Sequence, residues 1–137
     1  MPDDSSSLAL RFRAIAKFLP AMKAPDFKFA DLISRPSEFP FYDYSPTARA
    51  FIRAANDNGW VLGHFDWPSW KDTPEANMLR DDPNALKNAT PEQLAKLLTV
   101  LIRQERFCDG VLNSAFKSGL LTGILERVAV LLEESIS

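Results

Sequence analysis

The sequence predicts an all-α protein: a single compact domain of about five helices, with one extended segment rich in proline and aromatic residues. Apolar residues recur at helical spacing in several stretches of the chain. Ser45-Pro46 and Thr90-Pro91 each place a capping residue before a proline in the first helical turn. The chain has 137 residues, of which 46% are hydrophobic and 25% are charged, so it can bury one core.

The first helix is expected to follow Ser5–Ser7, whose hydroxyls can cap it. Pro20 ends its pattern. Residues 1–7 are polar, and we expect them to be flexible at the edge of a domain that spans residues 1–137. The apolar positions of the helix form one stripe: Leu8, Phe12, Ile15, Ala16 and Leu19.

Residues 20–45 form the extended segment. Prolines at positions 20, 25, 36 and 40 exclude a long helix. Residues Phe27–Ser34 are expected to form a short helix, and the remainder is expected to lie extended over the core, because disordered segments are poor in aromatic residues.

A second clear helix is expected from Pro46 to Asn58-Gly59, since Gly59 suits the left-handed conformation that follows a helix. Residues 60–62 then form a short extended piece, and residues 74–89 form one or two short helical turns. The buried face of the second helix comprises Ala48, Phe51, Ile52 and Ala55.

The next helix begins at Thr90, which can cap it, and Gln93 is placed to complete a capping box. Its broad apolar face comprises Leu94, Leu97, Leu98, Leu101, Ile102 and Cys108. A further helical stretch follows Gly110 and ends at Ser118-Gly119. The last helix carries Leu121, Ile124, Leu125, Val128, Leu131 and Leu132 at helical spacing.

Glu105 stands out because it falls in the middle of an apolar helical face. At about 100° per residue, Arg103 and Arg106 lie on the polar side of the same helix. A buried carboxylate needs a partner, so Glu105 is interpreted as a structural buried charge, held by capped backbone N–H groups or by an arginine of another helix. The candidate arginines are Arg49, Arg53 and Arg127. The alternative is an enzyme that uses Glu105 as a general acid or base.

Lys96, Arg103 and Arg106 predict a short basic strip on the polar side of this helix. The simplest interpretation is an ordinary solvated face, and the alternative is a surface for an anion, an acidic protein partner or a nucleic acid. Nucleic-acid binding is not favoured, because the net charge is −2 and the chain has no recognisable DNA-binding motif. Arg103 and Arg106 are instead predicted to bind a protein partner.

Residues 60–70 combine three tryptophans with a phenylalanine, a histidine and an aspartate. The simplest interpretation is core packing under a loop, because tryptophan buries a large area. Tryptophan is also enriched among the residues that dominate protein interfaces. The predicted partner-binding residues of this segment are Trp60, His64, Asp66, Trp67 and Trp70.

Other site chemistry finds little support in the sequence. A Cys108–His64–Asp66 triad can be written down, but one cysteine and one histidine in the chain constitute no pattern, so no catalytic residue is assigned. No His/Cys pair has the spacing of metal ligands, and no glycine-rich loop could cradle phosphate. We therefore expect no metal and no cofactor.

The composition also predicts where the protein works. The acidic start is unlike a signal peptide, and no apolar run approaches the roughly 18 residues of a membrane span. A single cysteine cannot form an intramolecular disulfide. These features predict a cytoplasmic protein without a membrane contact.

Several short motifs follow one another along the chain. They are PFYDYSP at residues 40–46, Phe51-Ile52, Gly59-Trp60-Val61, Phe65-Asp66-Trp67 with Trp70, and LLTVLIRQERFCDGVLNSAFKSG at residues 97–119. Together, over residues 8–132, they resemble a bacterial domain-of-unknown-function family of small proteins that also occurs on phage and mobile elements. The resemblance implies a single domain and brings no activity, cofactor or catalytic residue.

The sequence therefore predicts a non-enzymatic interaction or regulatory protein of the bacterial cytoplasm. Its partner is expected to be a protein, and a phage-borne member would bind a protein of the host. The sequence predicts no oligomeric state, and it assigns no role to Cys108 or His64.

Overall fold

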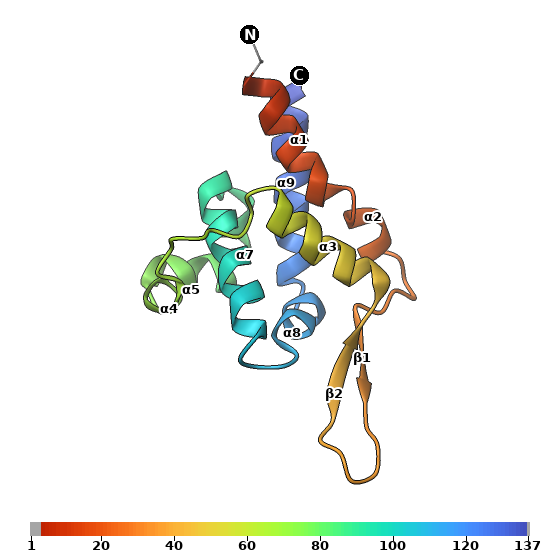
Figure 1. Ribbon diagram of the computed structural model, residues 1–137. Helices are drawn as coiled ribbons and strands as arrows, with labels where there is room; N and C mark the ends of the chain where they lie inside the picture. The colour runs from red at the N-terminus through yellow and green to blue at the C-terminus, as the bar shows by residue number, and fades with distance from the viewer. Residues whose placement is uncertain (1–3, 137) are drawn as a thin grey trace.

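The computed structural model describes residues 4–136, and in this part of the chain most of the structure is helical (Figure 1). The helices are α1 (Asp4–Ala16), α2 (Leu19–Met22), α3 (Pro46–Asp57), α4 (Trp67–Trp70), α5 (Pro74–Asp81), α6 (Pro83–Lys87), α7 (Pro91–Glu105), α8 (Val111–Lys117) and α9 (Leu120–Ile136). Two strands, β1 (Ala30–Ile33) and β2 (Phe41–Tyr44), form one small antiparallel sheet. The all-α prediction therefore holds for most of the chain, but the segment expected to be extended contains a small sheet.

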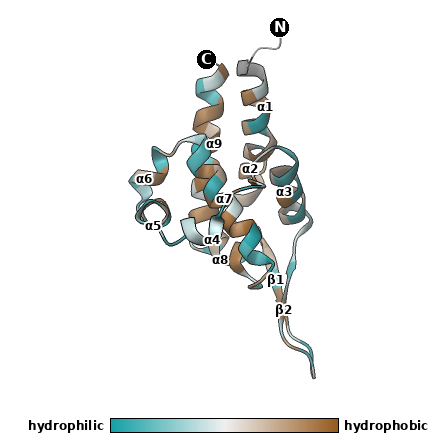
Figure 2. Cartoon of the chain, turned by 60° about the vertical axis from the view of Figure 1, so that its left-hand side comes forward, coloured by the Kyte–Doolittle hydropathy of each residue, from teal (hydrophilic) through white to brown (hydrophobic). Residues whose placement is uncertain are grey.

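Helix α9 runs through the middle of the molecule. Helix α1 packs along one side of it and α5–α6 lie on the other, as Figure 2 shows. The start of α1 and the end of α9 lie at the same end of the molecule (Figure 1). Helices α1 and α9, which are farthest apart in the sequence, thus pack together in one compact domain.

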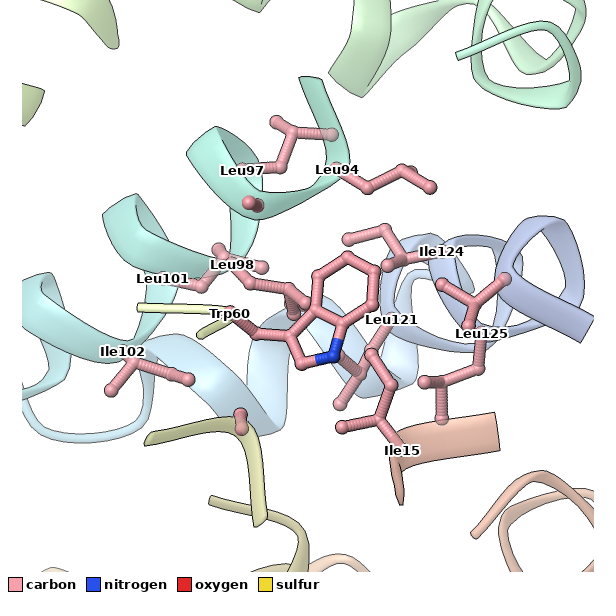
Figure 3. Close-up of a cluster of buried hydrophobic side chains, with 14 of the residues drawn as sticks. Ile15, Trp60, Leu94, Leu97, Leu98, Leu101, Ile102, Leu121, Ile124 and Leu125 are labelled. Carbon is pink, nitrogen blue, oxygen red and sulfur yellow. The ribbon is translucent and has the colours of Figure 1, made fainter. Parts of the chain in front are cut away.

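Trp60 sits at the centre of the core, where it has no exposed surface. Side chains from α1, α7 and α9 surround its ring (Figure 3). Its indole N–H donates to the carbonyl oxygen of Arg11 over 2.9 Å, and the Arg11 guanidinium lies 4.3 Å from the centre of the ring. A buried indole with a satisfied N–H and a cation on its face ties the loop after α3 to α1.

The two helix starts that the sequence marks most strongly are present. Ser45 Oγ accepts a hydrogen bond from the Ala48 N–H over 3.1 Å. Thr90 and Gln93 form the predicted capping box, in which each side chain accepts from the backbone N–H of the other residue. Both features depend on a few neighbouring residues, so local sequence is enough to predict them.

The first helix differs from its prediction at both ends. Helix α1 begins at Asp4, so residues 4–7 are helical, whereas residues 1–3 lie outside the described part of the chain. Ala9, and not Leu8, belongs to the buried stripe with Phe12 and Ile15. The helix ends at Ala16, and Pro20 lies in the first turn of α2.

Residues 30–44 form a β-hairpin where the sequence predicts a short helix at Phe27–Ser34. In the antiparallel register Ala30 faces Tyr44 and Leu32 faces Tyr42. The Ser45 N–H also donates to the Phe29 carbonyl over 2.9 Å, which extends the ladder at the base of the hairpin. Pairing with residues that lie about ten positions later overrides the local preference, as is common for strands.

Helix α7 ends earlier than its apolar periodicity predicts. Its last residue is Glu105, and residues 106–110 form the α7–α8 turn, which closes at Gly110 with φ of 96°. Cys108 is therefore an exposed residue of this turn and not part of a buried face. The helical phase that placed it inward does not apply beyond the helix end.

Candidate functional site

The three tryptophans predicted to bind a partner have different environments. Trp60 lies in the core, and Trp70 is also buried, with its indole N–H donating to Glu75 Oε1 over 2.7 Å. Neither side chain offers surface to a partner, so the prediction for these two residues is corrected: they stabilise the fold. Trp67 is only partly buried.

Trp67 forms an aromatic pair with a residue that the sequence did not single out. Its ring stacks on that of Phe107, with centroids 6.4 Å apart and an interplanar angle of 28°. Phe107 is 81% exposed although it is a large apolar residue. The sequence carries no local signal for this exposure, because its apolar periodicity predicts that the helix continues past Phe107, whereas α7 ends at Glu105.

Local structure holds this pair in place. Asp66 caps α4, because its Oδ1 accepts from the Ser69 N–H over 3.3 Å. Trp67 is the first residue of α4, and Phe107 is the second residue after the end of α7, against which α4 packs. We call Trp67 and Phe107, with the exposed residues His64, Asp66 and Arg106 that flank them in the sequence, the Trp67–Phe107 surface.

The predicted basic strip is not continuous. Arg106 is exposed and Arg103 is half-buried. The Lys96 ammonium lies over the rings of Phe65 and Trp70, at 5.6 and 5.9 Å from their centres, and pairs with Glu92 at 3.8 Å. Lys96 is thus engaged within the fold, and Arg106 is the most accessible cation of the three.

Glu105 is half-buried and connects three elements. Its Oε1 accepts from the Tyr44 hydroxyl over 2.6 Å and from the Leu112 N–H over 2.9 Å, and its Oε2 accepts from the Gly110 N–H over 2.9 Å. Of the two partner types that the sequence suggested, backbone N–H groups are present, whereas no arginine bonds to Glu105 within residues 4–136. The carboxylate caps the start of α8 and attaches β2 to the end of α7.

The same network holds the base of the hairpin. Asp109 Oδ2 accepts from the Tyr42 N–H over 2.8 Å. Burial, together with the hydrogen bond to Glu105, raises the pKa of the Tyr44 hydroxyl above its usual range. With both carboxylate oxygens of Glu105 occupied by donors, the arrangement favours a structural role for this residue.

The remaining candidate chemistry does not converge on a site. His64 and Cys108 are both exposed, and no contact joins them in the described chain. Within residues 4–136, no group of three or more His, Cys, Asp or Glu side chains is arranged to hold a metal ion. None of the helices over that range is both long and apolar enough to cross a membrane.

One feature of the surface was missed by sequence reasoning. A cavity of about 740 Å³ lies between α5–α6 and the first half of α9. Its lining includes the apolar residues Leu79, Leu86 and Leu120 and the basic residues Lys87 and Arg127. These residues come from segments more than 30 positions apart, so no local sequence pattern predicts the cavity.

Comparison with known proteins gives one match. A family model described as a family of unknown function, DUF6508, matches residues 8–134. No curated protein matches the chain. No solved structure matches it either.

Proposed function

The chain belongs to the DUF6508 family, whose function is unknown, and we propose that it is a non-enzymatic domain that binds a protein partner through the Trp67–Phe107 surface. One observation carries the proposal: a phenylalanine that is 81% exposed is stacked on a tryptophan at the surface of an otherwise well-packed fold. An exposed apolar side chain is common by itself, but adjoining exposed apolar groups bordered by polar residues often mark an interaction site.

The geometry of the pair suits binding. Stacking restricts the Phe107 ring before a partner arrives, so less side-chain entropy is lost on association. Arg106 is exposed next to Phe107 in the chain. Tryptophan and arginine are the residue types that most often dominate interface energetics, with aromatic residues enriched in interface centres.

The resemblance to bacterial and phage-borne proteins extends this proposal. It supports a regulatory role in the bacterial cytoplasm, in which the protein binds a protein of the cell that carries it. For a member encoded on a phage, that partner is a host protein whose activity is altered by binding. The surface chemistry favours a partner with an apolar recess bordered by acidic residues, which would receive Phe107 and Arg106.

The experiment is affinity capture from the lysate of the source cell, quantified by mass spectrometry. The bait variants are Phe107→Ala, Trp67→Ala/Arg106→Ala, and the control Asp57→Ala at an exposed position of α3. We expect a partner that wild type and Asp57→Ala retain equally, and that both surface variants lose by at least about tenfold. Identical capture by all baits, or capture of nothing, contradicts the proposal.

The two other function classes have less support. Nucleic-acid binding would depend on Arg103 and Arg106 alone, because Lys96 is engaged with Glu92 and Phe65. The signature of such binding is an affinity that falls steeply as the salt concentration rises. An enzyme using Glu105 would have to release a carboxylate that accepts three hydrogen bonds. Salt-titrated binding to DNA and RNA, with Arg106→Ala as the variant, separates the first class from protein binding.

A further inference from the structure

The β-hairpin extends away from the helical body. Figures 1 and 2 show it reaching beyond α3 and α8, at the end of the molecule opposite the last turn of α9. Its base is held by the hydrogen bonds from Tyr44 to Glu105 and from Tyr42 to Asp109. Its tip, residues 34–40, is exposed throughout, and Phe39 in that tip is 94% exposed.

The two outer edges of the hairpin differ. On β2, the outward Tyr42 N–H donates to Asp109, and the outward Tyr44 carbonyl accepts from Arg49 Nε over 3.0 Å. Leu32 lies opposite Tyr42 and Ala30 opposite Tyr44. When two residues face each other in an antiparallel pair, their N–H and C=O groups either all point towards the partner strand or all point away from it. The N–H and C=O groups of Ala30 and Leu32 therefore point outward from β1.

These outward groups of β1 have no hydrogen-bond partner between residues 4 and 136. An edge of this kind is a template for another strand, and proteins that do not use it normally block it with charge, proline or a covering element. Here the central edge residue is Leu32, which is 57% exposed. The edge is thus open and apolar at its middle.

We propose that two copies of this chain pair through β1, antiparallel and centred on Leu32, to form a four-stranded sheet across a two-fold axis. This surface is different from the Trp67–Phe107 surface and does not depend on the proposed function. A two-fold contact uses the same patch on both copies, so the patch must complement itself.

The patch meets that requirement along its length. When Leu32 faces itself, position 28 of one copy faces position 36 of the other, because both lie four residues from the centre. The turn that carries Glu38 and Phe39 in one copy then lies at the same end of the sheet as the base of the other hairpin. At that base a recess of about 280 Å³ is lined by residues that include Phe27, Phe116, Lys28 and Lys117.

The contents of tip and recess are complementary in charge and polarity. Glu38 pairs within its own tip only with Arg35, at 3.8 Å, and both side chains are more than half exposed. Lys28 pairs with Asp31 at 3.6 Å in an equally exposed setting. Exposed pairs of this kind contribute little, so both charges are available to a second copy, and the exposed Phe39 lies at the same end of the sheet as the aromatic recess of that copy.

Charge disfavours one of the neighbouring registers. The neighbouring register, with Ala30 facing Leu32, would place Asp31 directly opposite Asp31 of the second copy, and like charges in facing positions destabilise a sheet. Centring on Leu32 places Asp31 opposite Ile33 instead.

Sedimentation velocity of the full chain, from about 1 to about 500 µM, tests the proposal, since a small interface gives a weak dimer. Leu32→Pro removes the outward N–H while leaving the inward hydrogen bonds of β1 with β2 intact. We expect wild type and Phe107→Ala to dimerise alike and Leu32→Pro to raise the dimer dissociation constant by at least about tenfold, with an unchanged far-UV circular dichroism spectrum. A wild type that stays monomeric over the whole range overturns the proposal.

A cross-linking experiment tests the register of the pairing independently of the Leu32→Pro variant. In the Cys108→Ser background, Leu32→Cys places two thiols across the two-fold axis, where facing Cα atoms of a hydrogen-bonded pair lie about 5.5 Å apart, within reach of a disulfide. Asp57→Cys, an exposed position on α3, is the control. We expect a covalent dimer for Leu32→Cys at least about ten times faster than for Asp57→Cys. Equal rates, or no dimer of Leu32→Cys, refute the pairing.

Discussion

Replacing Glu105 by alanine is expected to be one of the most destabilising single changes near the surface of this protein. The side chain accepts hydrogen bonds from the Tyr44 hydroxyl and from the N–H groups of Gly110 and Leu112. Alanine leaves all three donors without that acceptor. It also removes the cap of α8 and the link between β2 and the end of α7 at once.

The magnitude follows from these contacts. A hydrogen bond to a charged group contributes about 1.5–3 kcal/mol, and loss of a helix cap costs about 0.5–2 kcal/mol. Glu105 is half-buried, so water can replace part of what is lost. We therefore expect Glu105→Ala to lower the free energy of unfolding by about 3 kcal/mol. Glu105→Gln, which keeps one acceptor oxygen, should lower it by about 1–2 kcal/mol.

The assay is urea unfolding at about 1 µM protein, followed by tryptophan fluorescence, because Trp60 is fully buried and reports the loss of the core. Glu133→Ala, at an exposed position of α9, is the matched control and should change stability by less than about 0.5 kcal/mol. A double-mutant cycle with Tyr44→Phe should give a coupling of about 1 kcal/mol. A Glu105→Ala cost below about 1 kcal/mol, or strict additivity with Tyr44→Phe, would refute the assigned network.

Three further predictions concern single positions. Tyr44 has a raised pKa in the folded protein, whereas an unfolded tyrosine loses its proton near pH 10. Its stabilising effect is therefore full below about pH 10 and falls progressively as the pH rises from there towards the raised pKa of the folded state, so the stability difference between wild type and Tyr44→Phe should begin to shrink above about pH 10 in urea titrations. Gly110→Ala should destabilise by about 2–4 kcal/mol, because φ is 96° and a Cβ would lie 2.5 Å from the Tyr42 ring; thermal and urea unfolding measure this, and a neutral result contradicts the packing. Gly123→Ala should stay within about 1 kcal/mol of wild type, because the added Cβ meets only the Cδ2 end of Leu86, at 2.8 Å, and alanine favours the helix; a cost as large as that of Gly110→Ala would be inconsistent with this reasoning.

The helical part of the fold could be predicted because its signals are local. Ser45 and Thr90 act through residues three positions away, and such caps are readable from the sequence alone. The apolar faces of α3 and α7 follow from spacing within each helix. The hairpin was missed because its stability depends on pairing between β1 and β2, which no single window contains.

The site was predicted only in part, for two physical reasons. Helical phase places side chains correctly only while the helix continues, so it failed for Cys108 beyond the end of α7 at Glu105. Composition also cannot separate tryptophans that fill a core from one that lies at the surface. Trp60 and Trp67 differ in burial because of where α4 packs on α7, and that arrangement is a property of the assembled fold.

The α7–α8 turn has a thermodynamic consequence for the two surfaces. Phe107 belongs to this turn, and so do Asp109 and Gly110, which hydrogen-bond to Tyr42 and Glu105 at the base of the hairpin. A partner that shifts the turn on binding Phe107 therefore changes the orientation in which the hairpin is held. Thermodynamic linkage makes this effect reciprocal. If the bound partner changes the affinity of one copy of the chain for another, dimerisation changes the affinity of the chain for the partner by the same factor.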